Sequence, residues 1–480
     1  MDLPWLLPQD VLADVLRFVP PRSLAACRCV CKALRSTIDD HCLLRADLLP
    51  LSVAGIFINF NDLPLPEFFS RPSAPAGPSI SGRFDYLPSS GLRLIRDHCN
   101  GLLLFKDYVA NPATRQWESL PPRSSMFMDV DADFTYEDYL VFDPTLSPHY
   151  EVFVIPRLRY KRVMRGFHDN NSEVMEKSEW PSSVLDLHVF SSKSGCWEGR
   201  GFIREGKAVG TVAEMRRPHW SWDKKRYGVY WRGDLFVLCE AEFTMRISLS
   251  NCTYRLIKSP MDTEVCRNSG FHLGRLKKGV YLASLHTACL LMVWVLEVAH
   301  GHTNWVLKHN ICLKSILQRR DYKEPVLGSW VLQDINFDEG VKYYKEHNEH
   351  AGYMEFLMQK KSILNSSCKE ELLEEEYEWD SENDDILDQK DVVGNCYHGC
   401  VGILGFHPYK EIVFLKVSLY RALAYHLKVS KVQDLGYIYP TSYYEVMSID
   451  RFIRESFLYT PCWIRHESSN GCGKPLLKPN

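Results

Sequence analysis

Four residues near the carboxyl end have the side-chain types that bind zinc. Cys396, His398, Cys400 and His407 could in principle supply the four ligands of a tetrahedral site. The Cys-x-His-x-Cys spacing is not that of a standard zinc knuckle, and alternate residues of an extended strand share a face but lie far apart along it. We therefore interpret the cysteines as structural and His407 as a loop histidine, and we predict no bound metal.

A second segment partly fits the phosphate-binding loop. Residues 201–208 have the sequence GFIREGKA, in which Ala208 replaces the Ser or Thr that would bind magnesium. The segment lies between β-rich runs and does not open a helix, so it lacks the helix N-terminus that makes such loops bind phosphate. The chain has no Gly-x-Ser-x-Gly, no His-Glu-x-x-His and no dinucleotide fingerprint after a strand. The sequence indicates no cofactor, and neither hydrolase nor dehydrogenase chemistry.

The composition is that of an ordinary protein of the cell interior with two unequal domains. The chain has 480 residues, of which 45% are hydrophobic and 24% charged, and its net charge of -3 favours no nucleic-acid partner. The start of the chain lacks a basic leader, and no apolar run reaches about 18 residues, so we expect no membrane partner. The 16 cysteines are scattered, which favours reduced thiols and a cytoplasmic or nuclear location.

The first fifty residues have the pattern of two short amphipathic helices. Pro8 suits the first turn of a helix, Pro20 and Pro21 end that helix, and Ser23 is placed to cap the next one. Apolar residues recur at helical spacing through both segments: Val11, Leu12, Val15, Leu16 and Val19, then Leu24, Cys27, Val30, Cys31, Leu34 and Ile38. So small a unit buries little surface, so either a partner or the following domain should cover its apolar stripe.

These residues resemble an F-box. The resemblance covers about residues 3 to 45, within a domain that we assign to residues 3–48, and rests on LPQDVL at 7–12, VPPRSL at 19–24 and RCVCK at 28–32. In that family the apolar stripe binds a Skp-type adaptor, which implies adaptor contacts for Leu7, Pro8, Val11, Leu16, Val19, Leu24, Val30, Cys31 and Leu34. Leu34 stands where the family usually has Trp, so we expect a reduced contact area and a reduced affinity.

The remainder of the chain has the pattern of an all-β domain. Residues 49–91 are expected to connect the domains, because the stretch from Leu63 to Ser90 is rich in Pro, Ser and Gly. Beyond them, short β-rich runs alternate with turns, and runs such as QWESLP at 116–121 and YRLIKSP at 254–260 recur about every 40 to 50 residues. This rhythm predicts a β-propeller of about six blades, with one or two β-sandwiches as the alternative.

A second resemblance favours the propeller. NGLLL at 100–104 and NPAT at 111–114 are similar to the first blade of the F-box-associated propellers of plants, and GDL at 233–235 and GFHP at 405–408 continue the likeness, especially to the large grass families. The resemblance implies a propeller over residues 92–465 and a tail at 466–480.

Two further features could serve binding. Trp220 and Trp222 would share one strand face and could line a sugar or peptide pocket, although in such propellers aromatic residues more often fill the space between blades. Residues 366–395 are dominated by Glu and Asp and should form a solvated, disordered loop. That loop is either an acidic lure for a basic partner or a tolerated insertion.

The pairing of the two resemblances implies a function without catalysis. It implies the substrate-recognition subunit of an SCF-type (Skp-cullin-F-box) ubiquitin ligase, in which the F-box binds the Skp-type adaptor and through it a cullin, while the propeller holds an unknown protein substrate. Two alternatives remain. One is an interaction protein acting outside the ligase, which weak adaptor binding at Leu34 would favour. The other is a propeller enzyme acting on carbohydrate or a small metabolite, for which the sequence offers no motif.

Overall fold

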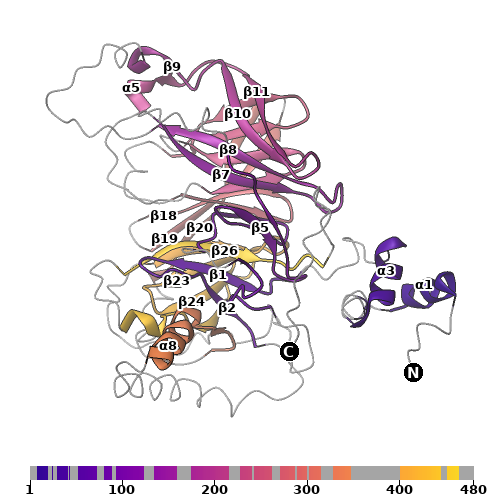
Figure 1. The fold of residues 1–480 in the computed structure, drawn as a ribbon. Helices are drawn as coiled ribbons and strands as arrows, with labels where there is room; N and C mark the ends of the chain where they lie inside the picture. Colours follow the sequence, from indigo (N-terminus) through magenta and orange to yellow (C-terminus); the bar gives the residue numbers. More distant parts are fainter. Residues whose placement is uncertain are drawn as a thin grey trace.

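The structure is a computed structural model, and Figure 1 shows two short helices beside a larger assembly of sheets. It describes residues 8–19, 24, 27, 30–41, 43, 52–72, 80–88, 93–123, 134–158, 175–215, 227–239, 243–261, 271–286, 289–299, 302–314, 328–347, 401–444 and 451–463. Several of the predicted features lie outside the described residues: Leu7, Trp220, Trp222, Cys396, His398, Cys400, the acidic segment at 366–395 and the tail at 466–480.

The amino-terminal unit contains helices α1 (Gln9–Arg17) and α3 (Lys32–Asp40). Pro8 precedes α1, and its carbonyl accepts the first helical hydrogen bond, from Leu12 N at 3.0 Å. The two helices contact each other, and their buried side chains form a small core of this segment alone: Leu12, Ala13, Leu16, Leu24, Ile38 and Leu43. These residues therefore have a core of their own. This core gives no support to the interpretation that the helices only cover the following domain.

The β-domain is built from six units of four antiparallel strands. From the innermost strand outward, blade 1 consists of β26 (Ile453–Tyr459), β1 (Gly55–Phe60), β2 (Glu67–Ser70) and β21 (Val331–Leu332). In the same direction, blade 2 consists of β3 (Asp97–Cys99), β4 (Leu102–Leu104), β5 (Tyr108–Asn111) and β6 (Gln116–Ser119). Blade 3 consists of β7 (Phe134–Phe142), β8 (Tyr150–Leu158), β10 (Val184–Ser191) and β11 (Cys196–Arg204).

The remaining three blades follow the same plan. Blade 4 consists of β13 (Gly228–Trp231), β14 (Asp234–Leu238), β15 (Thr244–Ser248) and β16 (Thr253–Ile257). Blade 5 consists of β17 (Phe271–Leu276), β18 (Gly279–His286), β19 (Leu290–Ala299) and β20 (His302–Cys312). Blade 6 consists of β22 (Val401–Phe406), β23 (Ile412–Val417), β24 (Arg421–His426) and β25 (Val432–Tyr437). Blades 3 and 4 are joined at their outer edges by a short parallel pairing of β11 with β16.

The six innermost strands form a closed ring. In order around the ring, β26 contacts β3, β3 contacts β7, β7 contacts β13, β13 contacts β17, β17 contacts β22, and β22 returns to β26. Antiparallel sheets arranged radially in this way are the architecture of a β-propeller. The prediction of a small helical domain followed by a propeller of about six blades is confirmed for the part of the chain that the structure describes.

Blade 1 corrects the predicted role of residues 49–91. β1 and β2 lie inside that range, and both are buried. β1 pairs with the carboxyl-terminal strand β26, for example Gly55 with Tyr459 and Ile58 with Ser456. The range is therefore not a simple connection, because its strands need a partner from the far end of the chain to complete their sheet, and the propeller begins well before residue 92.

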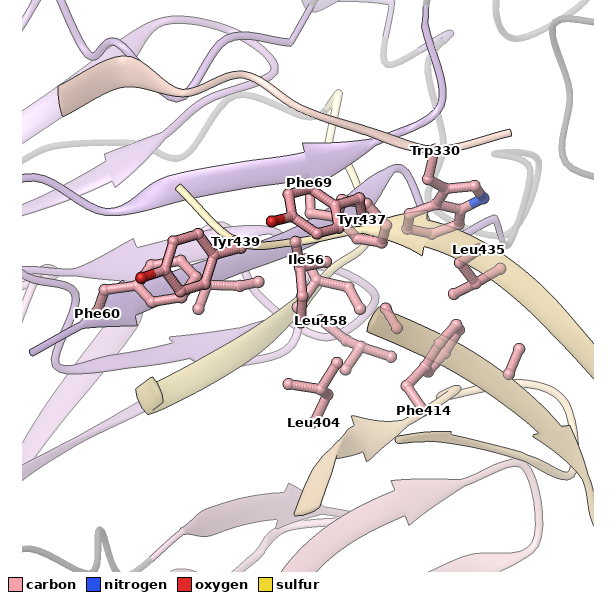
Figure 2. Close-up of a cluster of buried hydrophobic side chains, with 14 of the residues drawn as sticks. Ile56, Phe60, Phe69, Trp330, Leu404, Phe414, Leu435, Tyr437, Tyr439 and Leu458 are labelled. Atoms are coloured by element: carbon pink, nitrogen blue, oxygen red, sulfur yellow. The ribbon is translucent and has the colours of Figure 1, made fainter. Parts of the chain in front are cut away.

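Six hydrophobic clusters hold the blades together, and each fills the space between one pair of neighbours. Figure 2 shows the cluster between blades 1 and 6, where Ile56, Phe69 and Leu458 meet Phe414 and Leu435. β1, the second strand of blade 1, is buried along its whole length because the blade is covered on both faces, so its apolar pattern is continuous and does not alternate. The core of the propeller thus lies between the blades.

The other described elements do not belong to the six blades. A small lobe carries β9 (Glu179–Trp180), β12 (Gly210–Thr211) and α5 (Val212–Met215). Helix α8 (Ile335–His347) and the short 3-10 helix η5 (Thr441–Tyr444) lie against each other, and α8 also contacts β2 of blade 1.

Candidate functional site

Among the described residues of the amino-terminal unit, three exposed apolar side chains lie on one face of α1. Val11 is 44% exposed, Val15 is 52% exposed and Phe18, directly after the helix, is 89% exposed. Spacings of four and three residues place these side chains above one another on a helix. They form what we call the α1 stripe: Val11, Val15 and Phe18.

The neighbouring face of α1 is the buried one. Leu12 and Leu16 pack against Leu24 and Ile38, and Leu34 is half-buried against the same core. Leu16 and Leu24, which the sequence assigns to adaptor contacts, therefore lie in the interior of the unit. Their predicted role is corrected to a structural one, because a side chain that is packed between two helices offers no surface to another protein.

The other predicted contact residues are distributed between surface and interior. Pro8 and Val30 are exposed, Val30 at 74%, whereas Val19 and Cys31 are half-buried. Cys31 Sγ accepts a hydrogen bond from Leu34 N at 3.5 Å, so it helps to start α3. The sequence analysis placed Val15 in the apolar stripe but not among the adaptor contacts, and it did not single out Phe18. Their spacing from Val11 was a signal, but it could not tell the exposed apolar face of α1 from the buried one.

The residues with possible metal or phosphate chemistry have structural roles where they are described. The buried His407 side chain accepts hydrogen bonds at Nδ1 from Tyr409 N at 3.1 Å and Lys410 N at 3.2 Å. Burial, with Lys410 and His426, lowers the pKa of His407 to about 3, which keeps the ring neutral and able to accept. Its interpretation as a loop histidine agrees with this geometry. No cluster of three metal-ligating side chains occurs among the described residues.

The phosphate-loop-like segment at 201–208 lies in β11 and the loop that follows it. β11 continues to Arg204, and no helix begins within the segment. The backbone there pairs with neighbouring strands, including Ile203 with Thr253 of β16. The amides that would surround a phosphate are thus partly used by the sheet.

The described acidic side chains of the innermost strands are all engaged within the protein. Asp97 accepts a hydrogen bond from Leu140 N at 2.8 Å, and Glu455 accepts one from Asn59 Nδ2 at 2.7 Å. Asp138 is buried and forms ion pairs with Arg96 and Arg123. Glu137 is bonded to Tyr139 and Arg157. Because each carboxylate already has a partner, these groups serve the packing of the ring.

Comparison with known proteins identifies the amino-terminal unit. Residues 5–46 match the family model of the F-box domain. This segment is an F-box. The match includes α1, α3 and the α1 stripe. The six-bladed part of the chain lies outside the match.

The chain also has similarity to a known F-box protein and to a solved structure. An F-box protein from Arabidopsis thaliana is 24% identical over 241 residues, which cover 47% of this chain and 49% of the relative. The chain thus matches about half the length of that relative. A chain from a structural and mechanistic analysis of two prolyl endopeptidases aligns with 89% of this chain and 53% of its own, at 10% identity and a TM-score of 0.25. Among the described helices, none is long and apolar enough to cross a membrane.

Proposed function

We propose that this chain is the substrate-recognition subunit of an SCF-type ubiquitin ligase. The F-box binds a Skp-type adaptor and through it a cullin, and the propeller binds the protein to be ubiquitinated. The observation that carries this proposal is the exposed α1 stripe within a segment that matches the F-box domain.

The α1 stripe supports a protein partner on energetic grounds. Phe18 has nearly its whole side chain in water, and Val11 and Val15 lie on the same helix face. Covering apolar surface releases roughly 25 cal/mol for each Å² removed from water. The F-box core is completed without these three side chains, so a partner can cover the α1 stripe while the unit keeps its fold.

The two-domain layout supports the role of a non-catalytic receptor. The F-box fixes the chain to the ligase, and the propeller presents a second, separate surface for a substrate. Holding both in one chain raises the effective concentration of substrate lysines near the ubiquitin-charged enzyme. The proposed domains are an F-box at residues 3–48, a propeller from β1 to residue 465 and a tail at 466–480. The protein acts in the cytoplasm or nucleus.

The family assignment extends the same proposal. The similarity to an Arabidopsis thaliana F-box protein supports a plant-type F-box protein, and the closed propeller that follows the F-box supports the F-box-associated propeller class.

Co-immunoprecipitation of the full chain tests this function. Tagged wild-type protein is expected to bring down both a Skp-type adaptor and a cullin from a plant extract. Phe18→Asp places a charge in the α1 stripe and should abolish recovery of both, because a buried unpaired charge is strongly unfavourable. Val429→Asp is the matched control, since Val429 is 60% exposed in a turn of blade 6. Recovery of neither protein by the wild type, or equal recovery by Phe18→Asp, contradicts the proposal.

A further inference from the structure

One end of the propeller ring carries an arginine held between two aromatic rings. The guanidinium carbon of Arg275, near the end of β17, lies 5.9 Å from the ring centre of Trp231 and 5.8 Å from that of Tyr409. A second guanidinium, that of Arg232, lies 5.1 Å from the Trp231 ring. Blades 4, 5 and 6 each contribute to what we call the basic–aromatic surface: Trp231, Arg232, Arg275 and Tyr409.

This surface lies where the innermost strands turn outward, close to the axis of the ring. Trp231 ends β13, Arg275 is next to the last residue of β17, and Tyr409 is in the turn after β22. The charge of Arg275 reaches across to blade 2. Burial raises the pKa of the Cys99 thiol on β3 to about 12, and the positive charge of Arg275 opposes that rise.

The two arginines of this surface lack the acidic partners that other arginines have. Among the described residues, neither Arg232 nor Arg275 forms an ion pair, whereas Arg246 of the same blade 4 pairs with Asp234. The exposed Lys277 and Lys278 follow Arg275 in the next turn and add positive charge. The acidic groups nearby are fewer. Glu411 is shared by Lys278 and Lys428, and Asp143 lies near Cys99.

We propose that the basic–aromatic surface binds an anionic peptide segment of the substrate protein, through side-chain carboxylates or phosphates. This inference rests on the proposed function and names the chemistry of the substrate. The guanidinium of Arg275 lies near two aromatic rings, and a guanidinium offers a planar fork of N–H donors that matches a carboxylate or phosphate. Trp231 and Tyr409 offer apolar contact area to the rest of the peptide.

A peptide fits this surface better than a nucleic acid. Nucleic-acid surfaces follow the phosphate backbone with many Lys and Arg residues and usually belong to strongly basic domains. Here the two arginines lie at one end of blades 4 and 5, and the net charge of the chain is -3.

Fluorescence anisotropy with the purified full chain tests the proposal. The probes are a short labelled glutamate-rich peptide, the same peptide with phosphoserines, a lysine-rich peptide and a single-stranded oligonucleotide of similar length. Both anionic peptides should bind, and the ratio of their affinities tells carboxylate from phosphate recognition. Arg275→Gln should weaken the better of them by about tenfold or more, since a charged hydrogen bond is lost. Arg275→Lys should lie between, because it keeps the charge and loses the planar fork.

The matched control is Arg255→Gln. Arg255 lies on the outer strand of blade 4 and pairs with Glu205. This variant should leave peptide affinity unchanged. Adaptor binding, measured on the same samples, should be equal in all variants, so failure of this proposal is distinct from failure of the proposed function. Absence of binding by both anionic peptides, unchanged affinity in Arg275→Gln, or binding of the oligonucleotide alone overturns the proposal.

Discussion

Gly55 pairs with Tyr459, and this pairing joins β1, the first strand of the propeller, to β26, its last strand. Through this pairing β26 supplies the innermost strand of blade 1 and completes the ring. The free energy of unfolding of the whole propeller should therefore depend on β26. Leu458→Ala, at a side chain buried between blades 1 and 6, should cost about 2–5 kcal/mol.

Urea unfolding followed by tryptophan fluorescence measures this cost. The exposed Val429 provides the control, and Val429→Ala should change stability by less than about 0.5 kcal/mol. Equal, small effects of the two substitutions would show that the ring does not depend on its closing strand.

A buried ion pair in blade 6 leads to a second prediction. Arg421 of β24 and Asp434 of β25 are joined through two hydrogen bonds of 2.7 and 2.8 Å, and both side chains are buried. Asp434→Ala removes the carboxylate that this buried guanidinium binds and should cost about 3–5 kcal/mol. The comparable change at a half-exposed pair, Glu205→Ala opposite Arg255, should cost about 0–1 kcal/mol. Thermal unfolding of the two variants should rank them in this order, and the reverse order would contradict it.

Glu67 predicts a pH dependence of stability. Its buried carboxyl group accepts hydrogen bonds from Ile335 N at 2.6 Å and Asn336 N at 3.0 Å at the start of α8. Burial, together with Asp334, raises the pKa of Glu67 from 4.5 to about 7. The folded protein thus binds this proton more tightly than the unfolded chain. The stabilisation that the protonated Glu67 side chain contributes to folding is complete below pH 4.5 and is lost as the pH rises through about 7.

Urea unfolding between about pH 5 and 8 should show this loss in the wild type. Glu67→Gln keeps one acceptor oxygen at α8 and cannot titrate, so its stability should vary less over the same range. A variant that follows the wild-type profile would assign the pH dependence to other groups.

The sequence was sufficient for some parts of the fold and not for others, for physical reasons. Blades formed by neighbouring hairpins, such as the one containing Tyr254, are indicated by local repeats. β1 was missed because its partner β26 is far away in the chain and Pro-rich segments follow it. In the F-box, Val15 and Leu16 are adjacent apolar residues on α1, and only packing against α3 decides which of the two is buried. Arg275 acquires its aromatic neighbours from two other blades, which no local pattern could indicate.

Substitutions of Leu34 distinguish an F-box with reduced adaptor affinity from an F-box that acts outside the ligase. It is half-buried against the F-box core, at the position where the family usually has Trp. Leu34→Trp adds aromatic contact area and should raise adaptor affinity several-fold in surface plasmon resonance, and Leu34→Ala should lower it. If the adaptor affinity does not rise in Leu34→Trp while the helices stay folded, an interaction role outside the ligase is favoured.

The most direct test of the account is titration calorimetry of the full chain with a purified Skp-type adaptor. The wild type should bind with one-to-one stoichiometry. Val15→Asp, in the α1 stripe, should weaken binding by about a hundredfold while hydrogen exchange of α1 stays unchanged. Leu16→Ala should instead increase exchange in α1, because Leu16 belongs to the F-box core. No binding by the wild type, or binding by Val15→Asp at the wild-type affinity, would contradict the account.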